Sequence, residues 1–541
     1  MKLTYKNLIF IILISIFQIK VSAQQVSTLY FMENVPIRHN LNPAFQPTTR
    51  YYLSLPIIGF TQFGFGNNSV TLKDIIYNYN GQTITFLNPN GDINKFYNTL
   101  KPTSVLRTDL QTNLLSFGFK TKEAFWSLSI SEKIDGMVSI PKDFFKISLF
   151  GTTSINNNSF NLSTLQSDFS AYTEAAFGYS QKLDENLTVG IKLKLLYGNA
   201  NFSNTNEYLN LNAGIEKWTL NGSGSANVSS PSQLQVANNF QSISIQAPAN
   251  TADWLKPSGL GSGIDLGIDY RVNDRIRLSA AITDLGFIRW YKNVQNINYA
   301  ANYTFDGIGQ INSNMSSTNL RNLYTRFITR NALVDSLTTA LKSAYRLNNT
   351  TNAYTTGTTA KLNLGFEYNI LDDLVGFGLL SHAQFFKKTI TEELTASVNL
   401  RPSKWFNASL SYSLLDGRMG SIGAGIGLKT GIFHWLLAAD YIPFQKSTFL
   451  LSDFGANYPA INLPLPYNSK NFNLALGMNL VFDWLSHKEK NKADQMDGLK
   501  NNTSGNEYMN LNSEKRNSRS LNKQNSLHRN MSNQNCNCDS N

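Results

Sequence analysis

Residues Asn471 to Trp484, N-F-N-L-A-L-G-M-N-L-V-F-D-W, alternate a large apolar residue with a smaller or polar one along their whole length. A period of two is the pattern of a β-strand whose two faces meet different surroundings. Strands of soluble β-sandwiches usually span only about five or six residues. Because this stretch is much longer, it predicts a strand that crosses a membrane, with its large apolar side chains in lipid and the others facing a polar lumen.

The same alternation recurs through the central part of the chain. Further clear segments are 187–198, 264–271, 362–368, 394–400, 406–414 and 422–428. Short polar turns lie near residues 120–124, 182–186, 272–275, 371–373, 401–404 and 429–431, with longer connections between them. A first strand near Tyr51 then gives about fourteen strands, an even number, with short turns in the periplasm and long loops outside the cell. The sequence predicts an all-β fold, a transmembrane antiparallel β-barrel of about 14 strands over residues 50–485.

Three of the longer connections are expected to carry structure of their own, roughly 67–107, 199–261 and 292–358. In the third, apolar residues recur with helical spacing, which predicts a helix from about Asn331 to Tyr345. Two roles for this helix stay open. It is either a lid or plug of the barrel or a surface helix packed on neighbouring loops.

Tryptophan positions agree with a membrane barrel, in which aromatic side chains form girdles at the two interfaces. Trp126, Trp405 and Trp484 fall at predicted periplasmic strand ends, Trp435 lies a little way in, and Trp290 falls at an outer end. These five residues are therefore predicted to belong to the two girdles.

The N-terminus has the pattern of a secretory signal peptide. Lys2 and Lys6 precede the apolar run 8–17, and Val21-Ser22-Ala23 supplies small residues for cleavage. Residues 1–23 are thus expected to be removed, and Gln24, which is not a cysteine that could carry a lipid, begins the mature chain. The predicted localisation is the cell outer membrane. At the other end, residues 486–541 are rich in Asn, Ser, Lys and Arg and are expected to form a disordered periplasmic tail.

Composition excludes several classes of protein. The chain of 541 residues has a net charge of +11, but its basic residues are scattered, so a nucleic-acid partner is not expected. After the signal peptide no run reaches the roughly 18 apolar residues that a membrane-spanning helix needs. A helical inner-membrane protein is therefore excluded.

Strand parity predicts which charged side chains face the lumen. The candidate lumen-lining residues are Glu174, Lys192, Lys194, Asp265, Asp269, Arg271 and Arg277. If three residues turn after Arg271, Asp269 pairs with Arg277 across the hairpin, and a similar register in the earlier hairpin pairs Glu174 with Lys192. Such charges either brace the barrel wall or form a basic strip that attracts anionic solutes. The strip would consist of Lys192, Lys194, Arg271 and Arg277.

Catalysis and metal binding find little support in the sequence. Only five histidines are present, and none has the spacing that would place it beside a nucleophile and an orienting acid. Cys536-Asn537-Cys538 offers too few ligands for a tetrahedral metal site. The chain is therefore expected to be neither an enzyme nor a cofactor-binding protein.

Several short motifs resemble a known group of barrels. The motifs are Ser27-Thr28-Leu29-Tyr30-Phe31-Met32, Asn42-Pro43-Ala44-Phe45, Asp284-Leu285-Gly286-Phe287-Ile288-Arg289-Trp290 and the last strand. Together they resemble a Bacteroidota family of outer-membrane barrels with a domain of unknown function, related to FadL-type transporters and to PorV, a partner of type IX secretion. The resemblance implies that Asn42, Pro43 and Ala44 form a hatch-like motif and that residues 24–49 form a plug. It also implies a small hydrophobic ligand or a secretion partner.

The last strand also resembles the signal that the outer-membrane assembly machinery recognises. Its matching residues are Gly477, Leu480, Phe482 and Trp484. The expected partners are therefore this machinery and outer-membrane lipid. The function expected from the sequence is passage of small or hydrophobic solutes across the outer membrane, and the alternative is a PorV-like interaction protein that transports nothing.

Overall fold

The structure is a computed structural model. It describes residues 26–80, 82–150, 158–213, 218–236, 243–248, 250, 252–253, 256–305, 345–386, 389–415, 418–442, 446–449, 463–466 and 470–482. The predicted signal peptide and the predicted tail lie outside the described residues, as does Trp484.

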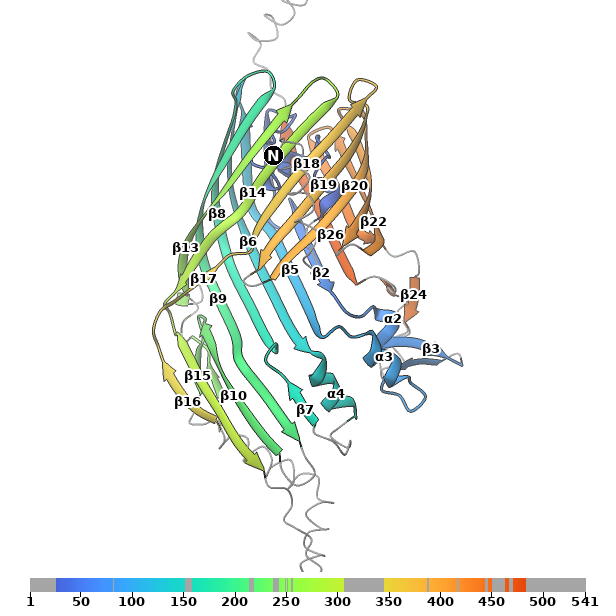
Figure 1. The fold of residues 1–541 in the computed structure, drawn as a ribbon. Coiled ribbons are helices and arrows are strands. Elements are labelled where there is room, and N and C mark those ends of the chain that lie inside the picture. Colours follow the sequence, from blue (N-terminus) through green and yellow to red (C-terminus); the bar gives the residue numbers. More distant parts are fainter. Residues whose placement is uncertain are drawn as a thin grey trace, which may run out of the picture. The chain divides into compact units, whose positions relative to one another are not determined.

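A closed antiparallel barrel of 14 strands forms the body of the structure (Figure 1). Its first strand is split into β1 (Tyr51–Ser54) and β2 (Thr61–Asn67). The others are β5 (Thr103–Lys120), β6 (Ala124–Pro141), β8 (Gln166–Lys182), β9 (Leu187–Ala213), β13 (Gly259–Arg271), β14 (Ile276–Trp290), β18 (Ala360–Ile370), β19 (Val375–Phe386), β20 (Thr389–Ser403), β21 (Phe406–Leu415), β22 (Arg418–Thr430), β23 (Phe433–Ile442) and β26 (Asn471–Phe482). The predicted fold class and strand number are confirmed.

The first and last strands close the barrel. Tyr51 is paired with Phe482 in β26, and Thr61 with Leu476, while both halves of the first strand also pair with β5. Between β1 and β2, residues 55–60 leave the regular ladder, and Ile57 has a left-handed backbone with φ of 65°. The Ile57 amide still donates to Asn113, so the wall stays hydrogen-bonded at this irregular point.

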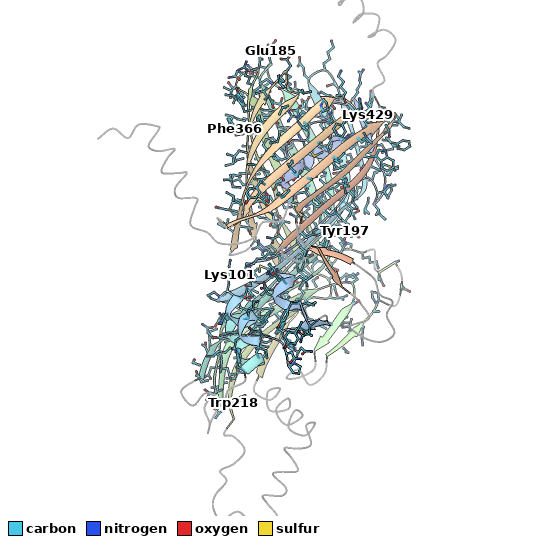
Figure 2. The ribbon with its side chains drawn as sticks, turned by 90° about the vertical axis from the view of Figure 1, so that its right-hand side faces the viewer. Lys101, Glu185, Tyr197, Trp218, Phe366 and Lys429 are labelled. Carbon is cyan, nitrogen blue, oxygen red and sulfur yellow. The ribbon has the colours of Figure 1, made fainter. Side chains whose placement is uncertain are left out.

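The two ends of the barrel differ. At the turn end, residues 121–123, 183–186, 272–275, 371–374, 404–405 and 431–432 join neighbouring strands, at the places where short turns were predicted. β9, which has 27 residues in all, extends past the barrel at the opposite, loop end and pairs there with β10 (Trp218–Ser229). Figure 2 shows Glu185 and Lys429 at the turn end and Trp218 at the far end of this extension.

The extension is a β-sheet, so much of the sequence expected to form long loops is in fact strand. β10 pairs with β15 (Gln295–Phe305), which pairs with β16 (Tyr345–Thr350), and β7 (Asn158–Asn161) pairs with β9. Residues 331–344 of the predicted helix lie outside the described residues, and Tyr345 begins β16.

Smaller elements complete the loop end. They are α2 (Leu72–Ile75), β3 (Ile76–Tyr79), β4 (Gln82–Thr85), α3 (Ile93–Thr99), α4 (Lys142–Phe150), β11 (Gln233–Val236), β12 (Ile243–Gln246), β17 (Tyr354–Gly357), β24 (Lys446–Phe449) and β25 (Leu463–Pro466). No helix among the described residues is long and apolar enough to cross a membrane.

The faces of the strands are sorted as the alternation predicts. In β26, Asn473, Ala475 and Asn479 are fully buried, whereas Leu476 is 46% exposed. Phe177 and Leu193, paired across β8 and β9, are 49% and 56% exposed on the outer face. Large apolar side chains cover the outside of most strands, and a surface of this kind is stable only in contact with lipid. The barrel therefore spans a membrane.

A β-bulge overturns the prediction for Trp290. Thr283 and Asp284 in β14 together oppose the single residue Asp265 in β13, and Asp284 has φ of 59°. The extra residue reverses the facing of all positions after it. Trp290 therefore points inward, is fully buried, and donates from its indole nitrogen to Thr356 at 2.8 Å instead of joining a lipid-facing girdle.

An N-terminal segment, residues 26–49, lies inside the barrel. It contains two short 3-10 helices, η2 (Ser27–Leu29) and η3 (Pro36–Asn40). Its apolar side chains form a small core with inward-facing wall residues. The members of this core include Val26, Leu29, Met32, Val35, Ile37, Tyr52, Phe60, Phe125, Leu436, Ala438 and Ala475.

Candidate functional site

Both predicted hairpin registers are wrong, although the predicted faces are kept. Arg271 pairs with Arg277 and Asp269 with Ser279, a shift of two residues, while Glu174 pairs with Leu196 instead of Lys192. A shift of an even number of residues leaves each side chain on its original face. Asp269 and Arg277 still form an ion pair at 2.6 Å, because the arginine reaches diagonally across the hairpin.

The lumen near the turn end contains an ionic cluster that holds the N-terminal segment, here called the anchor cluster. Its members are Glu33, Asp269, Arg277, Glu367 and Arg401. Arg277 donates to Asp269 through two nitrogens, at 2.6 and 2.7 Å, and also contacts Glu33 of the segment. Arg401 contacts Glu367 and donates to the Phe31 carbonyl at 2.9 Å. The wall thus binds the segment through two arginines.

The predicted hatch-like motif lies against two glycines of the wall. Gly190 in β9 and Gly267 in β13 are direct cross-strand partners. A Cβ atom on Gly190 would come within 2.3 Å of the Pro43 backbone, and one on Gly267 within 2.1 Å of the Asn42 side chain. The Asn42 amide donates to the carbonyls of the adjacent wall residues 268 and 280, at 3.1 and 3.3 Å. Because both glycines lack a side chain, the chain can pass directly over the strands here.

Hydroxyl and imidazole groups attach the rest of the segment. The Thr28 hydroxyl lies 2.6 Å from that of Ser411 and donates to Asp440. Tyr30 contacts Ser279 at 3.0 Å, and the buried His39 imidazole lies 2.6 Å from the hydroxyl of Tyr52. These contacts reach β21, β23, β14 and β1, so they attach the segment around much of the wall. His382 and His434, the other two described histidines, are buried on inward-facing wall positions.

A second ionic cluster, here called the central cluster, lies between the N-terminal segment and the loop end. It consists of Lys133, Glu174, Lys194, Asp265, Asp284 and Lys361. Asp284 contacts Lys133 at 2.7 Å, Lys194 at 2.6 Å and Lys361 at 3.5 Å. The backbone amide of Asp284 also donates to Asp265 at 2.6 Å. The bulge that turns Trp290 inward therefore also places the carboxylate of Asp284 at the centre of this cluster.

Three adjoining cavities follow the central cluster along the lumen. The largest of the three contains about 640 Å³ of space between its lining atoms, open solvent included, and is lined on one side by the N-terminal segment. A second, of about 270 Å³, shares Lys133, Asp284 and Lys361 with the first, and a third, of about 360 Å³, shares Asp135 and Tyr172 with the second. The row of cavities extends toward Phe386 and Thr356 at the loop end.

The structure brings some predicted lumen residues together and separates others. Lys194, Glu174 and Asp265 meet in the central cluster, whereas Asp269 and Arg277 belong to the anchor cluster. Lys192 donates to Asn40 at 2.7 Å, and Arg271 is exposed at the turn end. Because Lys192 and Lys194 line the same cavity, the basic strip predicted from sequence is divided between that cavity, the anchor cluster and the turn end.

Several residues of the clusters were not identified from sequence. Lys133 follows Ser127, Ser129 and Ser131 on one face of β6, an alternation that identifies it as an inward position. Lys361 and Glu367 also lie on the inward face of their strand, β18, where the alternation identifies them in the same way. The inward position of Asp284 depends on the bulge and has no comparable signal.

The described part of the predicted assembly signal lies in the closing strand. Gly477 faces inward where residues 55–60 leave the ladder, and a Cβ atom there would come within 2.7 Å of the Gly59 carbonyl. Leu480 and Phe482 are partly exposed on the outer face. No group of three or more His, Cys, Asp or Glu side chains among the described residues is arranged to hold a metal ion.

Comparisons with known proteins give one family. The model of a family of unknown function, DUF5723, matches residues 43–440, and no curated protein matches the chain. Among solved structures, the chain is similar to the Ralstonia pickettii toluene transporter TbuX, with a TM-score of 0.37 and 10% identity over 82% of this chain and 93% of that one. It is also similar to a Pseudomonas aeruginosa FadL homologue, with a TM-score of 0.36 and 10% identity over 86% and 100% of the two chains.

Proposed function

The chain belongs to the family of unknown function DUF5723, and we propose that it is an outer-membrane channel for small polar solutes that its N-terminal segment closes. The observation that carries this proposal is the row of three adjoining cavities, which ends against the N-terminal segment. A solute that entered from the loop end would reach the segment and would pass only if the segment moved.

The lining of the cavities favours polar over hydrophobic solutes. Acidic, basic, amide and hydroxyl side chains line the side of the largest cavity formed by the wall, and its apolar lining comes mainly from the segment. A hydrophobic solute would displace water from these polar groups without replacing its hydrogen bonds. The hydrophobic solutes implied by the sequence resemblance are therefore a less suitable cargo than small polar or ionic ones.

A reversible disulfide between the segment and the wall tests the proposal. Thr28→Cys with Ser411→Cys replaces two hydroxyls that are 2.6 Å apart, in a background with Cys536→Ser and Cys538→Ser. The oxidised protein should pass no small polar solute into liposomes, and reduction should restore the flux, because only the reduced segment can move. Thr395→Cys with Ser413→Cys is the matched control, since these hydroxyls are 2.7 Å apart and both belong to the wall.

The result that would contradict the proposal is equally specific. If oxidised and reduced forms of the Thr28/Ser411 pair passed solutes at the same rate, segment movement would not control passage. If the wild-type chain passed no solute under any condition, the channel function itself would be wrong.

A second candidate function is favoured by the sheet beyond the barrel. β9, β10, β15 and β16 form a wall at the loop end that solute passage does not require. A non-transporting interaction protein, as the resemblance to PorV implies, would use such a surface to hold an exported partner. A stoichiometric protein partner in detergent extracts, together with the absence of any flux, would favour this function over the channel.

A further inference from the structure

The largest cavity is lined by more positive than negative charge. Its charged residues are Arg38, Lys133, Lys192, Lys194 and Lys361 against Glu174, Asp265 and Asp284, five cations to three anions. The three carboxylates form ion pairs with three lysines of the central cluster, at 2.6 to 3.5 Å. Lys192 and Arg38 are the two cations outside this balanced set.

Lys192 is held by a neutral group. Its side chain is buried, with 3% of the residue exposed, and its ammonium donates to the Asn40 amide oxygen at 2.7 Å. An ammonium group has three hydrogens to donate. In the described part of the chain Asn40 is the only side chain that contacts this ammonium within hydrogen-bond distance, so donors remain for a further acceptor.

Arg38 also has a donor to spare. The residue is 6% exposed, its guanidinium lies 4.0 Å from the centre of the Phe45 ring, and its buried Nη1 has no hydrogen-bond partner among the described atoms. The carboxylates of the anchor cluster, which interact electrostatically with Arg38, are bound by Arg277 and Arg401. A buried donor without a partner is unfavourable, so an acceptor at this position would stabilise the site.

We propose that this cavity binds a small hydrophilic oxyanion, a carboxylate or a phosphate, between Lys192 of the wall and Arg38 of the N-terminal segment. A guanidinium and an ammonium are the groups that proteins use to recognise such oxygens. The hydroxyls of Ser131 and Thr283 line the same cavity and offer further donors. The inference rests on the proposed channel, because it makes small anions the solutes that enter the lumen. A bound anion would connect the wall to the segment.

Direct binding to the purified full-length chain tests the inference without any transport. Lactate and inorganic phosphate are titrated separately into the protein in detergent. Calorimetry then gives the affinity for each anion and the number of anions bound per chain. At least one of them should bind, and Lys192→Gln and Arg38→Gln should each weaken that binding by about tenfold or more, because each loses a charge-assisted hydrogen bond. Lys192→Arg should keep most of the affinity, which separates lost charge from misfolding.

The control variant is Arg271→Gln, which removes an exposed cation at the turn end and should leave binding unchanged. If neither anion binds, or if Lys192→Gln and Arg38→Gln bind it as the wild type does, the inference is wrong. Flux of neutral solutes without anion binding would leave the channel standing and remove only this site. Anion binding without flux of any solute would support the binding site and contradict the channel.

Discussion

At the scale of single residues, Asp284 has two roles at one position. Its backbone, with φ of 59°, makes the bulge that reverses the facing of β14, and its carboxylate contacts three lysines of the central cluster. Residues other than glycine rarely adopt this conformation, although aspartate and asparagine tolerate it best. The same residue thus determines both the path of the strand and the charge balance of the lumen.

Three substitutions of Asp284 separate these roles. Asp284→Asn should lower the free energy of unfolding by about 3 kcal/mol, because it leaves buried lysines with one carboxylate fewer. Asp284→Ala should cost about 1 kcal/mol more than Asp284→Gly, since only alanine resists the left-handed backbone. Urea unfolding in lipid or detergent measures both differences, with the exposed turn substitution Asp274→Asn as the control. Equal losses for alanine and glycine would show that the backbone contributes nothing.

At the scale of elements, the N-terminal segment depends on the absence of side chains in the wall beneath it. The segment passes over the paired residues Gly190 and Gly267, and its Asn42 side chain completes the contact by binding wall carbonyls. Anything larger than hydrogen at these positions meets the backbone or side chains of residues 42–44. The strands themselves have no need of glycine here, because alanine is compatible with a β-strand.

Replacing either glycine should therefore release the segment while the barrel stays intact. Gly190→Ala or Gly267→Ala should make residues 26–49 accessible to protease and should cost about 1–3 kcal/mol through overpacking. Gly263→Ala is the matched control on β13, because its Cβ would come no closer than 3.3 Å to another atom. If the segment resisted protease in both variants as well as it does in the control, the two glycines would not be what allows the segment to lie against the wall.

Strand identity could be predicted from sequence, but strand register could not. Alternation identifies Asn473 and Ala475 as inward residues whichever partner they have, because a side chain keeps its face when the pairing shifts by two. For the same reason alternation could not choose between Asp269 facing Arg277 and Asp269 facing Ser279. The inward positions of Asp284 and Trp290 could not be predicted for a different reason. One inserted residue in β14 reverses the alternation of inward and outward positions after it. The ionic clusters arise from strands far apart in sequence and need the closed barrel to be seen.

At the scale of the whole barrel, one strand passes through two environments. β9 presents Leu193 and Leu195 to the outside of the barrel, and the same outer face continues into the extension with residues such as Asn204. The first part of this surface is apolar enough to need lipid, whereas the extension is rich in Asn, Ser and Thr. The bilayer should therefore end between these two parts of β9.

Arginine substitutions along β9 locate this boundary. Leu193→Arg should reduce the stability of the folded barrel by roughly 2–4 kcal/mol, the cost of a charge on the lipid face near the bilayer centre. Asn204→Arg, a partly exposed position on the same outer face as Phe202, should change stability little. Folding into liposomes followed by denaturant titration compares the two. A similar cost at both positions would place Asn204 in lipid as well and would move the predicted boundary outward.

The pairing of β1 with β26 also bears on how the folded barrel is assembled. The N-terminal segment leads directly into β1, and β1 reaches its partner Phe482 only when the last strand has arrived. Because β1 starts beside the turn 121–123, the segment enters the lumen through the turn end, where the wall arginines contact it. Docking of the segment and pairing of β1 with β26 therefore involve one continuous stretch of chain, so a change that slows docking of the segment should appear as delayed biogenesis even where the mature barrel is fully stable.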